Sequence, residues 1–198
     1  MTNSATIDGL ARASAAIGDL LDRIAADQWA APTPCAEWTV RDVVGHLVGT
    51  NLVFTAMLEQ GPAPDRGGDH LGDDPAGAFR RSAAALQSAV AHSEVLDRSQ
   101  PTPAGVGKGV SLGVATGAER MRWRIADLLT HGWDLTRATG VAAALPDDLV
   151  EQSLTFVQAQ LPGQARAGRF GDPQPIGDDA PAIDRLAAFT GRPVGWTP

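Results

Sequence analysis

Residues 39–73 read TVRDVVGHLVGTNLVFTAMLEQGPAPDRGGDHLGD, and this stretch predicts both a helix and the way in which the chain leaves it. Thr39 and Asp42 have the spacing of a capping box. Apolar residues then recur at helical intervals to about Gln60. The loop at 61–73 can extend to about 43 Å, whereas the helix is only about 33 Å long. Because the loop can carry the chain back along the molecule, we expect this helix and the next to run parallel.

Further helices are expected on both sides of this stretch, whereas no repeat and no convincing strand alternation is present. Asp74-Pro75 predicts a helix start, and Gly140 a helix end. The additional helices are expected at about 4–28, 75–92, 117–138, 146–161 and 181–190, with an irregular or weakly extended segment at 97–115. The pattern predicts an all-α fold, in which a four-helix bundle at 1–161 carries a Gly/Pro-rich extension at 162–198 packed on it.

Composition excludes several classes of protein. The 198 residues suit one domain, and the formal charge of −7 argues against a basic nucleic-acid-binding face and against attraction to anionic membranes. The single cysteine, Cys35, excludes an intramolecular disulfide and a Cys-rich zinc module. No signal-peptide pattern and no apolar run of about 18 residues is visible. We therefore expect a cytoplasmic protein whose partners include neither nucleic acid nor membrane.

Two helices carry residues that can hold a metal ion. Asp127 and His131, in RIADLLTHGWDL (124–135), lie four residues apart and share one helix face. His46 lies near the middle of an apolar stretch of the helix at 39–60. If these helices face each other, the three side chains form a divalent-metal site with open positions.

Neighbouring carboxylates offer further roles, and simpler readings remain open. Asp134 can orient His131, add a ligand or act as a catalytic base, and Asp42 can orient His46 or merely cap its helix. Most Asp-x-x-x-His pairs on helices are surface pairs, and a lone mid-helix histidine is more often a core residue. Spacing alone therefore leaves the metal site a minority hypothesis.

Two motifs resemble a known family. CAEWTVRDVVGHLVGTN (35–51) and RIADLLTHGWDLTRATG (124–140) resemble the signatures of the DinB-like superfamily, in its mycothiol-dependent maleylpyruvate isomerase branch. The tail at 170–196 resembles that of an actinobacterial subfamily of uncharacterised metal-binding proteins. The resemblance implies an up-down-down-up four-helix bundle. It also implies zinc or nickel held by residues that match His46, Asp127 and His131.

The sequence departs from the isomerase at two points. The isomerase has a glutamate where this chain has Asp127, and it has a separate C-terminal domain for which the residues after Leu161 are too few.

The metal site and the resemblance together lead us to expect a transferase or isomerase in which the metal activates a small thiol such as mycothiol toward an electrophilic substrate. Asp134 is the candidate catalytic residue, and no cofactor-binding residue is named.

Other functions stay open at this point. A metal-dependent hydrolase would use water in place of the thiol, with Asp134 or Asp42 as base. A non-catalytic metal-binding or stress-response module, a bundle without metal, and a homodimer are the further alternatives.

Overall fold

The computed structural model describes residues 1–65, 68–101, 114–161, 166 and 170–198. Most of the segment expected to be irregular at 97–115, and the start of the predicted extension, lie outside these residues. The helices are α1 (Asn3–Leu21), α2 (Val40–Leu58), α3 (Pro75–Val90), α4 (Gly117–Thr139), α5 (Asp147–Gln160) and α6 (Ala182–Phe189). Short strands β1 (Ser99–Pro101) and β2 (Val114–Thr116) pair antiparallel, and 3-10 turns lie at Ala26–Gln28 and Ser93–Leu96.

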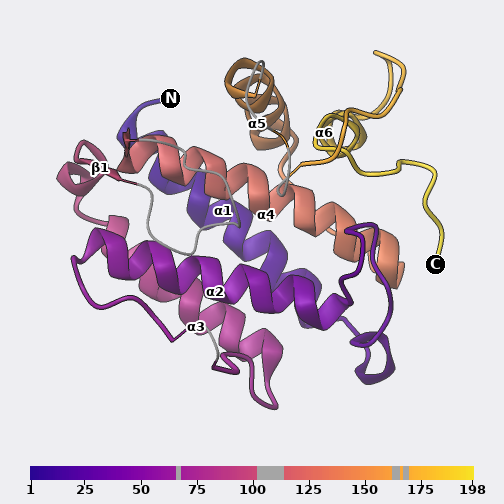
Figure 1. Cartoon of the computed structure of the whole chain (residues 1–198), viewed down its shortest axis with the longest axis horizontal. Helices are drawn as coiled ribbons and strands as arrows, with labels where there is room; N and C mark the ends of the chain where they lie inside the picture. The colour runs from indigo at the N-terminus through magenta and orange to yellow at the C-terminus, as the bar shows by residue number, and fades with distance from the viewer. Residues whose placement is uncertain (66–67, 102–113, 162–165, 167–169) are drawn as a thin grey trace.

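The first four helices form an up-down-down-up bundle. α1 and α4 run in one direction, and α2 and α3 run in the other (Figure 1). α1 packs mainly on α4, and α2 mainly on α3. Near the start of α2, Arg41 Nη2 donates to the carbonyl of Gly72, just before α3, at 2.9 Å. The long loop therefore returns the chain to the end at which α2 began. The expected parallel pair and the all-α bundle are both confirmed.

Side-chain caps fix the helix ends where the sequence predicts them. Thr39 and Asp42 form a reciprocal capping box at α2, and Asp74 accepts from the Gly77 amide ahead of α3 at 2.9 Å. α4 ends at Gly140, which has a left-handed φ of 70°. These caps satisfy backbone groups that the helix itself leaves unpaired, so they set the register of the residues that follow or precede them.

The first helix is shorter than its apolar pattern predicts. We expected a helix over 4–28, but α1 ends at Leu21 and is followed by a tighter turn, in which the Ile24 amide donates to the Leu21 carbonyl at 3.3 Å. Ile24 is nevertheless buried. The apolar periodicity runs past the helix end because this side chain still packs on the core after the backbone has left the helix.

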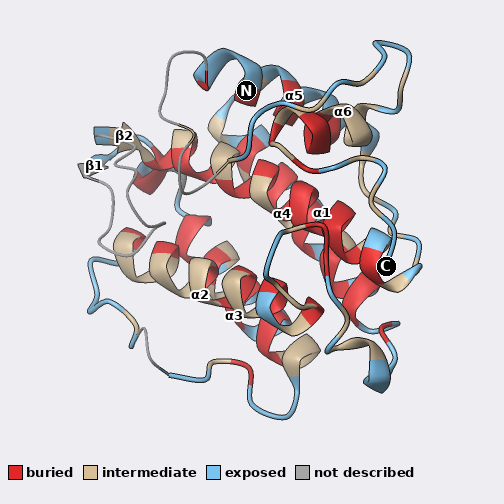
Figure 2. Cartoon of the chain, turned by 45° about the vertical axis from the view of Figure 1, so that its right-hand side comes forward, coloured by how far each residue is buried: buried red, intermediate tan, exposed pale blue. Residues whose placement is uncertain are grey.

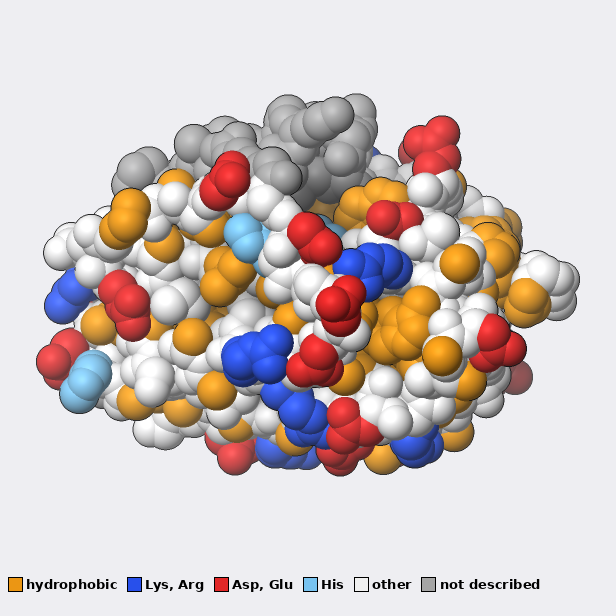
Figure 3. Space-filling model, turned by 90° about the horizontal axis from the view of Figure 1, so that it is seen from below, with side chains coloured by type: hydrophobic (Ala, Val, Ile, Leu, Met, Phe, Trp, Pro, Cys, Tyr) orange, Lys and Arg blue, Asp and Glu red, His pale blue; other side chains and the backbone are white. Residues whose placement is uncertain are grey.

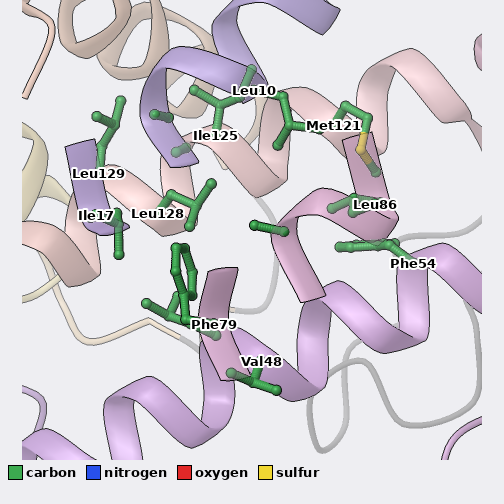
Figure 4. Packing of buried hydrophobic residues seen from close by; sticks show 14 of the residues in the cluster. Leu10, Ile17, Val48, Phe54, Phe79, Leu86, Met121, Ile125, Leu128 and Leu129 are labelled. Carbon is green, nitrogen blue, oxygen red and sulfur yellow. The ribbon is translucent and has the colours of Figure 1, made fainter. Parts of the chain in front are cut away.

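One hydrophobic core joins the four helices. The labelled side chains of Figure 4 come from all four of them: Leu10, Ile17, Val48, Phe54, Phe79, Leu86, Met121, Ile125, Leu128 and Leu129. α4 is buried along most of its length (Figure 2). At Gly132, an added Cβ would lie 2.7 Å from Ile17 Cδ1. Glycine at this position therefore allows α1 to approach α4 closely, beside His131.

The outer face of the bundle carries charges of both signs. Acidic and basic side chains lie intermixed over the face seen in Figure 3. Exposed side chains of opposite charge pair at the surface, as Arg41 does with Asp69 and Arg81 with Asp74. Within the described residues, no helix is both long and apolar enough to cross a membrane.

The C-terminal part packs on the bundle through α6. α6 contacts both α5 and α4. Trp133 Nε1 and Arg137 Nη2, both on α4, donate to Asp184 Oδ1 on α6 at 2.6 and 2.9 Å. The division into a bundle at 1–161 and an extension at 162–198 stays a prediction.

Candidate metal centre

α2 and α4 bring His46, Asp127 and His131 together. His46 Nε2 lies 3.1 Å from Asp127 Oδ1, and His131 Nε2 lies 3.5 Å from the same oxygen. One donor atom from each residue falls within 4.8 Å of the other two. The two helices therefore face each other at these side chains, which is the condition that the metal-site hypothesis requires.

These separations fit a small cation. Ligand distances of about 2.0–2.2 Å in a tetrahedral zinc site place neighbouring donors about 3.4 Å apart. The observed 3.1 and 3.5 Å lie close to that value. Imidazole nitrogen and carboxylate oxygen are also the donors that zinc and nickel accept. The residues present therefore suit a divalent metal.

The centre is closed on one side and open on the other. The His131 side chain is 6% exposed, whereas those of His46 and Asp127 are 32% and 29% exposed. Trp38, just before α2, stacks on the His131 ring with centroids 5.8 Å apart and lies 5.1 Å from the His46 ring. The indole therefore limits how the imidazoles can turn, while solvent reaches the site past His46 and Asp127.

A buried carboxylate orients His131 from behind. His131 Nδ1 lies 2.9 Å from Asp134 Oδ2, and Asp134 is fully buried. Arg192 Nη2 donates to the same oxygen at 3.0 Å, so the carboxylate is charged and acts as an acceptor. When Nδ1–H donates to Asp134, the lone pair of Nε2 points toward Asp127. That lone pair needs a cation or a proton between itself and the second carboxylate.

A second network holds Asp127 from its other side. The fully buried Arg124 guanidinium forms a short contact with Asp127 Oδ2. Its Nε donates to Asn51 Oδ1 at 3.0 Å, and its Nη2 donates to the Leu47 carbonyl at 2.8 Å. Asn51 donates in turn to Ser82 Oγ at 3.1 Å. Arg124, which is itself anchored to α2, therefore fixes Asp127 Oδ2, so that Asp127 Oδ1 faces the two histidines.

The charges at the centre shift the ionisation of all three residues. Burial lowers the pKa of His46, although Asp127 partly offsets this effect. Burial also disfavours charge on His131, but the carboxylates of Asp127 and Asp134 outweigh it and raise the pKa of His131. Desolvation opposes ionisation of Asp127, yet the two histidines hold its pKa well below the usual range. Asp127 is therefore an anion in an electropositive setting.

A second group of donor atoms lies behind His131. Cys35, His131 and Asp134 each have a donor atom within 4.8 Å of the others. Arg192 Nη2 lies 3.7 Å from Cys35 Sγ and also binds Asp134, so a fixed positive charge already occupies this position. Burial raises the pKa of the Cys35 thiol to about 11, against the opposing charge of Arg192. A neutral thiol beside a guanidinium is poorly suited to bind a cation.

The candidate site residues identified from the sequence fall into two groups in the structure. His46, Asp127 and His131 come together, and Asp134 lies beside them but hidden from solvent. Asp42 accepts the Thr39 amide in the capping box at 2.9 Å, so its carboxylate serves the start of α2.

Two arginines at the centre carried weak signals in the sequence. Arg124 lies within a helix, where an arginine most often faces solvent, so the sequence around it does not signal the burial that the structure shows. Arg192 lies in a Gly-Arg-Pro sequence outside any periodic segment, so only tertiary structure could identify it.

Comparisons with known proteins match this chain to one family. Residues 10–136 match the family model described as the mycothiol maleylpyruvate isomerase N-terminal domain. Two relatives, both described as uncharacterized proteins of Mycobacterium tuberculosis, come from strains CDC 1551 / Oshkosh and ATCC 25618 / H37Rv. Each is 34% identical over 187 residues, covering 92% of this chain and 95% of the relative. No solved structure gives a significant match.

Proposed function

Because the chain belongs to the mycothiol maleylpyruvate isomerase N-terminal domain family, we propose that it binds a divalent metal and uses it to activate a small thiol. The reaction class is transfer of that thiol to an electrophile, or isomerisation of the electrophile. His46, Asp127 and His131 are the proposed ligands, with zinc or nickel as the metal and mycothiol as the thiol.

The observation that supports this proposal most is the convergence of three donors, two of which belong to partly exposed side chains. Three protein ligands leave a fourth position free, which is the arrangement of catalytic rather than structural zinc sites. The side chains of His46 and Asp127 are 32% and 29% exposed. A small thiol can therefore approach the free position from solvent.

When bound, the metal supplies a lowered pKa for a coordinated thiol, which makes the thiolate available at neutral pH. The protein supplies orientation. Asp134 holds the His131 ring through Nδ1 at 2.9 Å, and Trp38 stacks on the same ring. Neither His131 nor Asp134 offers a solvent-facing base. We therefore assign Asp134 to positioning rather than to proton transfer with substrate.

Arg124 accounts for how the shorter side chain of Asp127 can act as the carboxylate ligand. Aspartate is one methylene shorter than glutamate, so its carboxylate needs to be held forward. Arg124 binds Oδ2, and the contacts of Arg124 with Asn51 and Leu47 fix the guanidinium. Oδ1 alone then faces the two imidazoles, which favours ligation through one oxygen.

Cobalt(II) substitution followed by mycothiol addition tests the proposal. We expect a thiolate-to-metal charge-transfer band that rises saturably with mycothiol and is absent in His46→Ala. Incubation with a panel of electrophiles then reports thiol consumption. Protein that holds cobalt but never binds the thiol would contradict the proposal. Turnover that proceeds equally well without thiol would favour the hydrolase instead.

A further inference from the structure

We propose that Arg192, in the C-terminal segment, is a positioning residue of the metal centre that acts through Asp134 on His131. The inference rests on the proposed function, since His131 is a proposed ligand. It assigns the segment that follows α6 a role in tuning metal affinity.

A continuous series of hydrogen bonds runs from Arg192 through Asp134 to the proposed metal ligand His131. Arg192 Nη2 lies 3.0 Å from Asp134 Oδ2, and Arg192 Nε lies 3.3 Å from each carboxylate oxygen. Asp134 Oδ2 lies 2.9 Å from His131 Nδ1. All three residues are buried. Because water does not compete well here, the guanidinium fixes where the carboxylate sits, and the carboxylate fixes the plane of the ring.

The backbone around Arg192 is itself held in place. The Arg192 amide donates to the Ala187 carbonyl of α6 at 2.9 Å. Gly191 has a φ of +93° and passes so near Gly171 that an added Cβ would lie 2.4 Å from Gly171 Cα. The tight turn at Gly191 and Arg192 therefore fixes the position from which the guanidinium reaches Asp134.

α6 connects this turn to the helix that carries the ligands. Asp184 accepts from Trp133 and Arg137 of α4. Trp133 lies two residues after His131 in the chain. A displacement of α6 would therefore move Arg192 and change the position of the Asp134 carboxylate, in addition to changing the packing of α6 on α4.

The chemistry favours arginine at this position over lysine. Arg192 reaches Asp134 through two nitrogens, Nε and Nη2, and its Nη2 also lies 3.7 Å from Cys35 Sγ. A planar fork fixes a carboxylate in orientation as well as in position, which an ammonium cannot do. A Lys substitution would keep the charge and lose the orientation.

Metal affinity tests the inference with the full chain. We would measure the zinc dissociation constant by competition with a chelator, together with the visible spectrum of the cobalt(II) form. Loss of a partner behind a ligating histidine typically costs about 10–100-fold in affinity. We expect Arg192→Ala to weaken zinc by that range and to alter the cobalt spectrum, and Arg192→Lys to recover only part of the affinity.

Arg185→Ala is the matched control. Arg185 also lies in the C-terminal part and pairs with Glu151 at 2.8 Å, and among the described residues its side-chain hydrogen bonds go to Ala180 and Glu151 and not to Asp134. We expect this variant to bind zinc like the wild type. Urea unfolding of both variants separates loss of fold from loss of affinity.

A double variant tests the route through Asp134. If Arg192 acts through this carboxylate, Asp134→Ala and the Arg192→Ala/Asp134→Ala pair should have the same zinc affinity. Unchanged affinity in a folded Arg192→Ala variant, or additive losses in the pair, would overturn the inference while leaving the metal site intact. Absence of zinc binding in the wild type would overturn the proposed function as well.

Discussion

Replacement of Arg124 by methionine probes the network that holds the proposed carboxylate ligand. The guanidinium is fully buried and binds Asp127, Asn51 Oδ1 and the Leu47 carbonyl. Methionine fills much of the same volume but donates no hydrogen bond. The substitution therefore removes the polar contacts with little loss of packing.

The expected cost follows from what each partner loses. Asn51 is 1% exposed, so its unpaired amide oxygen costs about 1–3 kcal/mol. Asp127 is 29% exposed, so water replaces part of the lost contact and its share is small. Leu47 lies within α2 and its carbonyl also accepts the helix's own bond. Together these contributions give an expected loss of about 1–4 kcal/mol in the free energy of unfolding.

Urea denaturation in the presence of a metal chelator measures this loss. With a urea slope of about 2 kcal/mol per molar, the midpoint should fall by roughly 0.5–2 M. Arg81→Met is the matched control, because Arg81 is 69% exposed and pairs with Asp74 at the surface at 3.3 Å, where such pairs contribute at most about 1 kcal/mol. Equal midpoints for the two variants would refute the reasoning.

Three further outcomes follow from the geometry. Burial raises the pKa of Cys35 to about 11, so iodoacetamide should alkylate it at pH 8 on the order of 100-fold more slowly than a free thiol of pKa near 8.5; a rate that levels off near pH 8.5 would disprove this. Gly132→Ala places a Cβ 2.7 Å from Cδ1 of the buried Ile17 and should cost about 1–3 kcal/mol in thermal or urea unfolding, whereas unchanged stability would show that a shift of Ile17 and the helix propensity of alanine offset the added methyl group. Hydrogen bonds from Thr39 lower the pKa of Asp42, so its ionised form stabilises the fold above pH about 4 and this stabilisation is lost as the pH falls further. The stability difference between wild type and Asp42→Asn should therefore shrink between pH 6 and pH 3, and a constant difference would contradict the capping role.

Most of the bundle could be predicted from local signals. Thr39, Asp74 and Gly140 mark helix ends with side-chain or backbone chemistry that acts within a few residues. The length of the loop at 61–73 predicted that α2 and α3 run parallel, because the maximum span of a loop depends only on how many residues it contains. The end of α1 was misplaced, because an apolar residue after a helix reads like one inside it.

The candidate site was predictable only in part. Asp127 and His131 share a helix face by spacing alone, and joining His46 to them needed the helices to meet, which local sequence does not specify. Arg192 reaches the centre from 58 residues beyond Asp134. Contacts of that kind leave no periodic trace in a single sequence.

Metal content tests the central claim most directly. Wild-type protein, His46→Ala and the control His92→Ala, whose histidine is exposed, would be purified without chelator, incubated with zinc or nickel, dialysed and subjected to elemental analysis. We predict about one divalent metal ion per chain for the wild type and the control, and loss of that ion in His46→Ala. Full occupancy in His46→Ala, or none in the wild type, would contradict the account.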